Sequence, residues 1–242
     1  MSLFHSPASR WTASVTHLLL SILLIGSIAL FAFLHWYPAG LHHAAKLDKL
    51  MGIMLGVDIV AGPLLTLILY RRGKKGLKID LATIAVLQLA FLGYGLNTLW
   101  QSRPIFLVGS QEAFALIFAP GLPPDIEEQA IKEKWPRFRN SGPWLAAVDL
   151  SGRVARDEFL TSAEHGNSGP LAATALYIPY SKLSSSIAAA AHPLGEDITT
   201  TGRETRSSIR TLHLMSSQTD QAVVLLDAAS GEPLRIALPD GK

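Results

Sequence analysis

The feature that most constrains this chain is an apolar stretch, residues 50–70, with one acidic residue near its centre. It reads LMGIMLGVDIVAGPLLTLILY. About 20 apolar residues cross the hydrocarbon core of a bilayer as a helix, and a charge at that depth costs about 2.5 to 3.5 kcal/mol on insertion scales. Asp58 is therefore expected to face other helices, or to be protonated, rather than to face lipid.

The residues around Asp58 are small or helix-bending. Gly52 and Gly56 form a small-xxx-small step that lets another helix backbone approach closely. Gly62 precedes Pro63, which lacks a backbone N–H and predicts a kink. The stretch is thus expected to pack, to bend and to hold one polar group inside. Two roles for Asp58 stay open, namely a structural hydrogen bond to a neighbouring helix and a direct contact with a functional partner.

Two further apolar runs, residues 15–36 and 79–100, make three predicted transmembrane helices with 50–70. A cleaved signal peptide is the alternative for the first run. A retained membrane helix is favoured, because the run exceeds the usual signal core of about 7 to 15 residues. It also ends in an aromatic anchor of the interfacial type, His35-Trp36-Tyr37.

The third run carries polar groups of its own. Gln88 and Tyr94 lie within about one helical turn of the predicted depth of Asp58, so either side chain could hydrogen-bond its carboxyl group. Asp80, at the start of the run, is expected to cap the helix N-terminus, with Thr83 in the same turn.

The loop between the second and third runs predicts the orientation. Short loops rich in Lys and Arg stay in the cytoplasm, and this loop holds Arg71, Arg72, Lys74, Lys75 and Lys78. The N-terminus is then cytoplasmic, and everything after Trp100 lies in the periplasm of a Gram-negative inner membrane. The sequence pI of 8.9 does not indicate nucleic acid as a partner, because the basic excess lies between membrane spans. Membrane lipids are an expected contact of the chain.

The predicted fold is a membrane α-helical domain, residues 1–101 with three transmembrane helices, followed by a C-terminal α+β soluble periplasmic domain, residues 102–242. The second part has no apolar run long enough to span a bilayer and is long enough for one core. Its expected strands are 105–108, 113–118, 144–148, 222–226 and 234–238, and its expected helices are 125–135 and 181–192, the latter capped by Ser181.

Catalytic and metal-binding patterns are not found in the sequence. The chain has no cysteine, no phosphate-binding glycine loop, no HExxH and no nucleophile elbow. Intramembrane aspartyl proteolysis requires paired carboxyl groups, whereas Asp58 is the one acid inside a predicted span. We therefore predict no enzyme activity, no cofactor and no metal.

Several motifs resemble the TfpX/TfpZ family of type IV pilin accessory proteins. The first 110 residues carry most of the resemblance, in GVDIVAGPLLTLIL (56–69), Lys74-Lys75, Ile79-Asp80-Leu81, Gln88, Tyr94-Gly95 and Arg103-Pro104. In the C-terminal half it is looser, around Leu226-Asp227 and Gly231-Glu232.

The resemblance implies an inner-membrane, chaperone-like helper of type IV pili. Its partner would be a major or minor pilin, and it would assist pilin stability, assembly or surface display without catalysis. The candidate packing and partner site in the spans is Gly52, Gly56, Asp58, Gly62, Pro63, Gln88 and Tyr94. Two alternatives stay open: a scaffold subunit of another envelope complex, and a small transporter or sensor that uses Asp58 as a proton or ion site.

Overall fold

The structure is a computed structural model that describes residues 9–44, 52–53, 56–71, 73–120, 122–149, 157, 174–195, 198, 205–215 and 222–238. The chain forms two compact units. The helical unit comprises Met1–Ala32 and Asp48–Trp100, and the sheet unit comprises Phe33–Leu47 and Gln101–Lys242. The sheet unit therefore includes the loop after the first helix as well as the C-terminal half of the chain.

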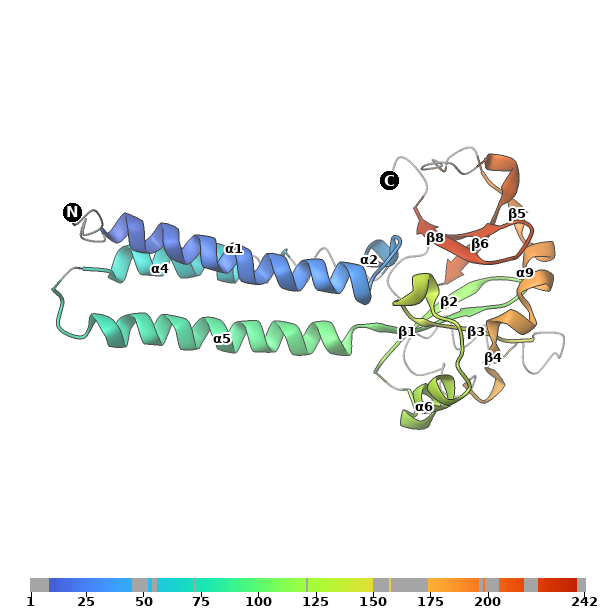
Figure 1. Cartoon of the computed structure of the whole chain (residues 1–242), viewed down its shortest axis with the longest axis horizontal. Coiled ribbons are helices and arrows are strands. Elements are labelled where there is room, and N and C mark those ends of the chain that lie inside the picture. The colour runs from blue at the N-terminus through green and yellow to red at the C-terminus, as the bar shows by residue number, and fades with distance from the viewer. Residues whose placement is uncertain are drawn as a thin grey trace, which may run out of the picture. The chain divides into compact units, whose positions relative to one another are not determined.

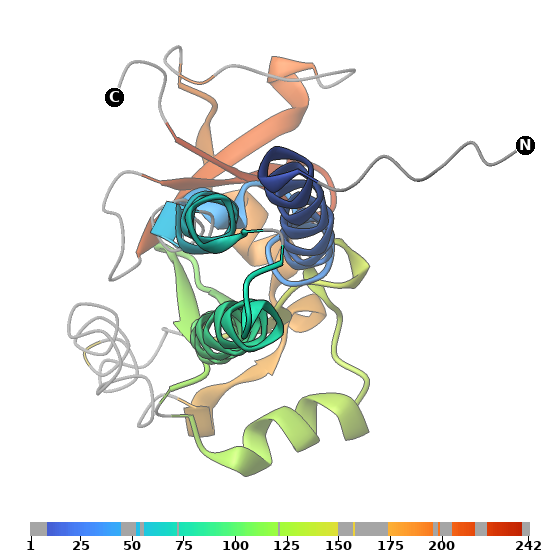
Figure 2. The same ribbon diagram turned by 90° about the vertical axis from the view of Figure 1, so that its left-hand side faces the viewer.

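Two long apolar helices dominate the helical unit: α1 (Arg10–His35) and α5 (Leu77–Gln101). Both are long and apolar enough to cross a membrane, and most of their side chains are exposed within the chain, as expected for surfaces that meet lipid. The helix α1 covers most of the predicted run 15–36 and begins before it. The helix α5 covers the predicted run 79–100 and extends beyond both of its ends. Figures 1 and 2 show α1 and α5 side by side with the shorter helix α4 (Gly62–Leu69).

The middle apolar stretch is not one long regular helix. Its described part is a helical turn at 52–53, a π-helix η1 (Gly56–Ala61) and an α-helix α4 (Gly62–Leu69). Pro63 stands in the first turn of α4, where its missing N–H is tolerated, and the wider π-helical turn directly precedes it. The change from π-helix to α-helix falls directly before Pro63, while the predicted kink at Pro63 and a third membrane span over 50–70 stay predictions.

The sheet unit is built on a mixed β-sheet. Its strands are β1 (Pro104–Gly109), β2 (Phe114–Phe118), β3 (Trp144–Ala147), β4 (Ile178–Pro179), β5 (His192–Pro193), β6 (Ile209–Met215), β7 (Val223–Asp227) and β8 (Pro233–Ala237). Their order in the sheet is β4-β3-β1-β2-β6-β7-β8, and β5 also pairs with β6. Pairing is antiparallel between β1 and β2 and parallel between β1 and β3 and between β2 and β6.

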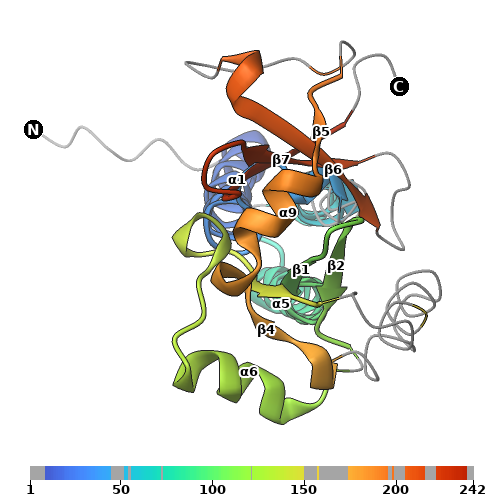
Figure 3. The ribbon, with the colours of Figure 1, turned by 90° about the vertical axis from the view of Figure 1, so that its right-hand side faces the viewer.

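The core of this unit forms where helices cover the sheet. The helix α6 (Pro124–Lys132) contributes Ile126 and Ala130 to a buried cluster with Phe106 of β1 and Trp144 of β3. Figures 1 and 3 show α6 and β5 at opposite sides of the unit. The hairpin of β1 and β2 turns at Ser110, whose hydroxyl oxygen accepts the Ala113 N–H at 3.1 Å. The predicted α+β class is confirmed.

The expected helix 181–192, with Ser181 as its cap, is wrong in its extent. The α-helix α9 covers only Ser184–Ala190, and a 3-10 turn, η5 (Tyr180–Lys182), precedes it. Leu183 is the N-cap residue and makes no side-chain capping bond. His192 has left the helix because it pairs with Thr211 of β6 in the sheet. Tertiary pairing thus outweighs the local helical preference.

The short segment after α1 completes the sheet unit. It contains α2 (Leu41–Ala44) and runs beside β8, where the Ile236 N–H donates to the Ala39 carbonyl at 2.9 Å. Gly40 has a φ of +88°, and a Cβ there would overlap the Ile236 carbonyl oxygen. The buried Tyr37 hydroxyl donates to the Ser102 carbonyl at 3.0 Å.

Candidate functional site

A polar stripe on α1 faces the α4 segment. Ser14 and His17 are three residues apart, so they share one face of the helix. The Ser14 hydroxyl donates to the Pro63 carbonyl at 2.9 Å, and His17 Nδ1 lies 2.6 Å from Thr66 Oγ1. Since the Thr66 hydroxyl donates to the Gly62 carbonyl at 3.0 Å, its oxygen is left to accept the His17 Nδ1–H. These contacts join two helices at polar points inside otherwise apolar surfaces.

Ser14, His17 and Thr66 were not among the site residues predicted from the sequence. The available signal was the spacing of Ser14, His17 and Ser21 at i, i+3 and i+7 in an apolar helix, which places them on one side. That spacing predicts a packed face, but the partner residues on α4 are set by the tertiary fold.

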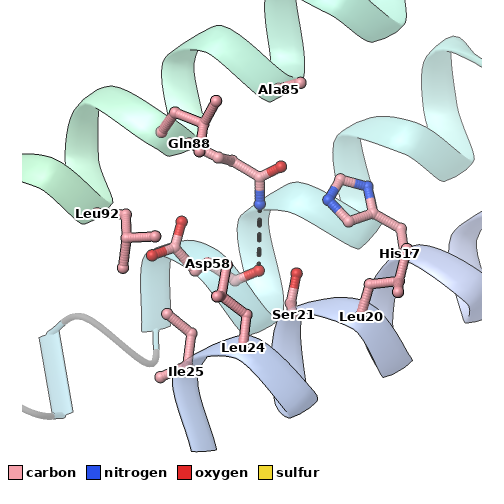
Figure 4. A pocket seen from close by; sticks show the side chains of 10 residues that line it. His17, Leu20, Ser21, Leu24, Ile25, Asp58, Ala85, Gln88 and Leu92 are labelled. Carbon is pink, nitrogen blue, oxygen red and sulfur yellow. Dashed lines mark hydrogen bonds between the residues drawn. The ribbon is translucent and has the colours of Figure 1, made fainter. Parts of the chain in front are cut away.

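Asp58 is the buried acidic group of the helical unit, with only 5% of its surface exposed. Its backbone carbonyl accepts a hydrogen bond from Gln88 Nε2 at 3.3 Å. Its carboxyl oxygen Oδ1 is buried and has no hydrogen-bond partner among the residues that the structure describes. Figure 4 shows the Gln88 amide directed at the Asp58 backbone and the carboxyl group lying between Gln88 and Leu92.

The carboxyl group lines a cavity of about 250 Å³ formed by α1, η1 and α5. The polar lining consists of Asp58, Gln88, Ser21 and His17. The rest of the wall is apolar and comes from α1 and α5: Leu20, Leu24, Ile25, Ala85, Leu89 and Leu92. The arrangement is an apolar pocket with one hydrogen-bond acceptor that the described part of the chain does not satisfy.

The cavity lies near the middle of both long helices. Ser21 is 11 residues from the start of α1, and Gln88 is 11 residues from the start of α5. At a rise of about 1.5 Å per residue, each stands about 16 Å along its helix, which is close to half the hydrocarbon thickness. If α1 and α5 cross a bilayer, the cavity is therefore at its midplane.

The predicted site residues fall into three groups. Asp58, Gln88 and Gly62 come together, and a Cβ added at Gly62 would overlap the Gln88 side-chain amide. Pro63 follows Gly62, and its carbonyl instead accepts from Ser14 of α1. Gly52 and Gly56 are exposed, and no described atom lies within 4 Å of where their Cβ atoms would be.

Tyr94 forms the third group by itself, being 73% exposed. It is six residues after Gln88, which rotates it by about 240° around the helix, so it does not share the Gln88 face. Of the two expected partners of Asp58, only Gln88 contacts it, through the backbone carbonyl rather than the carboxyl group.

The basic residues lie between α4 and α5, in the turn and the first residues of α5. Lys74, Lys75 and Lys78 are exposed, Arg71 is exposed at the end of α4, and Arg72 lies outside the described residues. Asp80 is not the expected N-cap, because α5 begins at Leu77 and Asp80 is within its first turn. Its carboxylate instead pairs with the Lys74 ammonium at 2.6 Å. This pair closes the turn, and the predicted cytoplasmic side of the loop stays a prediction.

No group of three or more His, Cys, Asp or Glu side chains that could hold a metal ion occurs within the described ranges.

Comparison with known proteins gives three relatives, all from Dichelobacter nodosus. The fimbrial assembly proteins of serogroups I and E1 are each 27% identical over 228 residues, which covers 87% of this chain and 88% of the relative. The fimbrial assembly protein of serogroups C1 and C2 is 31% identical over 103 residues, 42% of this chain and 79% of the relative. The chain belongs to the family of these fimbrial assembly proteins.

No protein-family model matches the chain. No solved structure matches it either. The family match therefore rests on whole-chain sequence similarity, which includes both units.

Proposed function

We propose that this protein is a non-catalytic inner-membrane accessory factor for type IV pilins, of the TfpX/TfpZ kind. It assists pilin stability, assembly or surface display. The observation that carries the proposal is the similarity to two fimbrial assembly proteins over 87% of the chain, because a match of that extent takes in both the helical unit and the sheet unit. The assignment to type IV pilins in particular rests on a second observation. The segment from Gly56 to Leu69 resembles the TfpX/TfpZ family of type IV pilin accessory proteins.

The proposed placement has three membrane spans, with 50–70 as the second. The N-terminus and the basic turn are cytoplasmic, and the sheet unit is periplasmic. Two long apolar helices and a basic turn between α4 and α5 support this orientation. A chain placed in this way has membrane helices and a soluble unit available to a pilin that is itself anchored in the inner membrane.

The proposed contact with the pilin has two parts. The helix around Asp58 meets the pilin's membrane helix, and the sheet unit meets the pilin's soluble head. Support for the first part comes from Gly52 and Gly56, which are exposed and leave room for a second backbone. If Asp58→Asn and Gly56→Leu both leave pilus assembly and the protein level unchanged, this contact is wrong.

The decisive experiment compares total and surface-exposed pilin in cells with and without the gene. A fall in surface pilin at constant total pilin indicates a role in assembly or display. A fall in both indicates protection of the pilin in the membrane. Unchanged amounts of both would refute the proposed function, and complementation with the intact gene is the control.

A further inference from the structure

The carboxyl group of Asp58 poses an energetic problem within the chain. Asp58 as a residue is 95% buried, its Oδ1 is buried with no hydrogen-bond partner among the described residues, and its side chain lines a cavity at mid-helix depth. An unsatisfied polar group in an apolar medium is costly, and a bilayer core supplies little water to satisfy it. A group kept at such a position is stabilised when a hydrogen-bond donor enters the cavity.

The polar neighbours in the cavity do not supply that donor. The Gln88 amide nitrogen donates to the Asp58 backbone carbonyl. His17 uses Nδ1 to bind Thr66. The Ser21 hydroxyl also lines the cavity, and among the described residues it makes no hydrogen bond to Oδ1. A donor that satisfies Oδ1 therefore comes from outside this set of contacts.

The size and walls of the cavity restrict what can bring the donor. A volume of about 250 Å³ is below the roughly 300 to 1,000 Å³ of typical small-molecule pockets, so it suits a single side chain better than a whole ligand. Leu20 and Leu89 at the rim are 61% and 63% exposed. Apolar rim residues at bilayer depth suit the apolar surface of another membrane helix.

We propose that this cavity receives one side chain of the pilin's transmembrane helix, and that this side chain carries a hydrogen-bond donor that binds the Asp58 carboxyl group. The choice of the pilin as the source of that helix rests on the proposed function. The chemistry required is an apolar stem with a hydroxyl, amide or ammonium group at its end.

The test is photo-crosslinking in living cells that express the full chain. A benzophenone amino acid replaces Leu89 at the cavity rim, and adducts are detected with an antibody to the pilin. We expect a pilin adduct in the otherwise unchanged chain. Ala85→Leu, which narrows the cavity without altering Asp58, and Asp58→Leu, which removes the acceptor, should each lower the adduct yield about tenfold.

A matched variant controls for a general effect of a larger side chain. Ala90→Leu makes the same change on α5 at an exposed position that does not line the cavity, and it should keep the adduct yield. Immunoblots establish that each variant accumulates in the membrane. Asp58→Asn keeps an acceptor oxygen without charge, so retained yield indicates a neutral donor and lost yield indicates an ammonium group.

Several outcomes would overturn the inference while leaving the proposed function intact. One is a pilin adduct at Leu89 that is equally strong with Ala85→Leu and Asp58→Leu. Another is an adduct with phospholipid only, or no adduct, in cells whose surface pilin still depends on the gene. Failure of the proposed function is a different result, namely surface pilin that does not depend on the gene at all.

Discussion

Replacement of Gly62 by alanine should destabilise the helical unit through Gln88. A Cβ at Gly62 would overlap the Gln88 amide, so the side chain must move and its hydrogen bond to the Asp58 carbonyl is lost. Hydrogen bonds between membrane helices are worth about 0.6 to 1.7 kcal/mol. Overpacking adds about 1 to 3 kcal/mol. The higher helix propensity of alanine offsets about 1 kcal/mol of this destabilisation. The net loss in free energy of unfolding is therefore about 0.6 to 3.7 kcal/mol.

The assay is the free energy of unfolding of the purified protein in detergent micelles, measured by titration with a denaturing detergent. Gly56→Ala is the matched control, because nothing described lies near its Cβ position, and it should be neutral or slightly stabilising. In a Gln88→Ala background the obstacle is gone, so Gly62→Ala should cost little. An equal cost of Gly62→Ala with and without the Gln88 side chain would refute the reasoning.

Three further predictions concern the sheet unit and the topology. Tyr180→Phe removes a 2.6 Å hydrogen bond to the Gly231 carbonyl and should cost about 1 to 3 kcal/mol, seen as a lower thermal midpoint, because the acceptor stays buried. Since the chain has no cysteine, single cysteines at Lys75 and Ser230 report topology: an impermeant maleimide applied to spheroplasts should label only position 230. Hydrogen bonds from Ser230 lower the pKa of Asp227, so its contribution to stability is present above about pH 4 and is lost as the pH falls through its folded pKa. Asp227→Ala should therefore reduce the fall in thermal midpoint between pH 7 and pH 3.

The elements that the sequence predicts well are those encoded by local patterns. Long apolar runs predict α1 and α5, and apolar strands beside turn residues predict β1, β2, β3, β7 and β8. The strand β6 was missed, because Arg210 and His213 interrupt its apolar pattern. Its pairing with β2 is parallel and joins residues about 100 positions apart, which local sequence cannot encode.

The candidate site shows the same division. Asp58 and Gln88 were found because a polar residue in an apolar run is conspicuous, and Gly62 and Pro63 because they break helical regularity. The choice between Gln88 and Tyr94 depended on helix rotation, and the His17 contact with Thr66 depended on which faces of α1 and α4 meet. Polarity can be taken from the sequence, whereas pairing follows from how the helices pack.

The segment after α1 has a consequence for how such proteins can be recombined. Ala39 and Gly40 contact Ile236, and Tyr37 contacts Ser102, so the sheet unit uses residues from both sides of the second apolar stretch. A hybrid gene with one junction near position 101 would join a sheet from one parent to the 33–47 segment of another. Functional chimaeras between relatives are therefore expected to need two further junctions, near positions 33 and 48, so that 33–47 comes from the same parent as the C-terminal half.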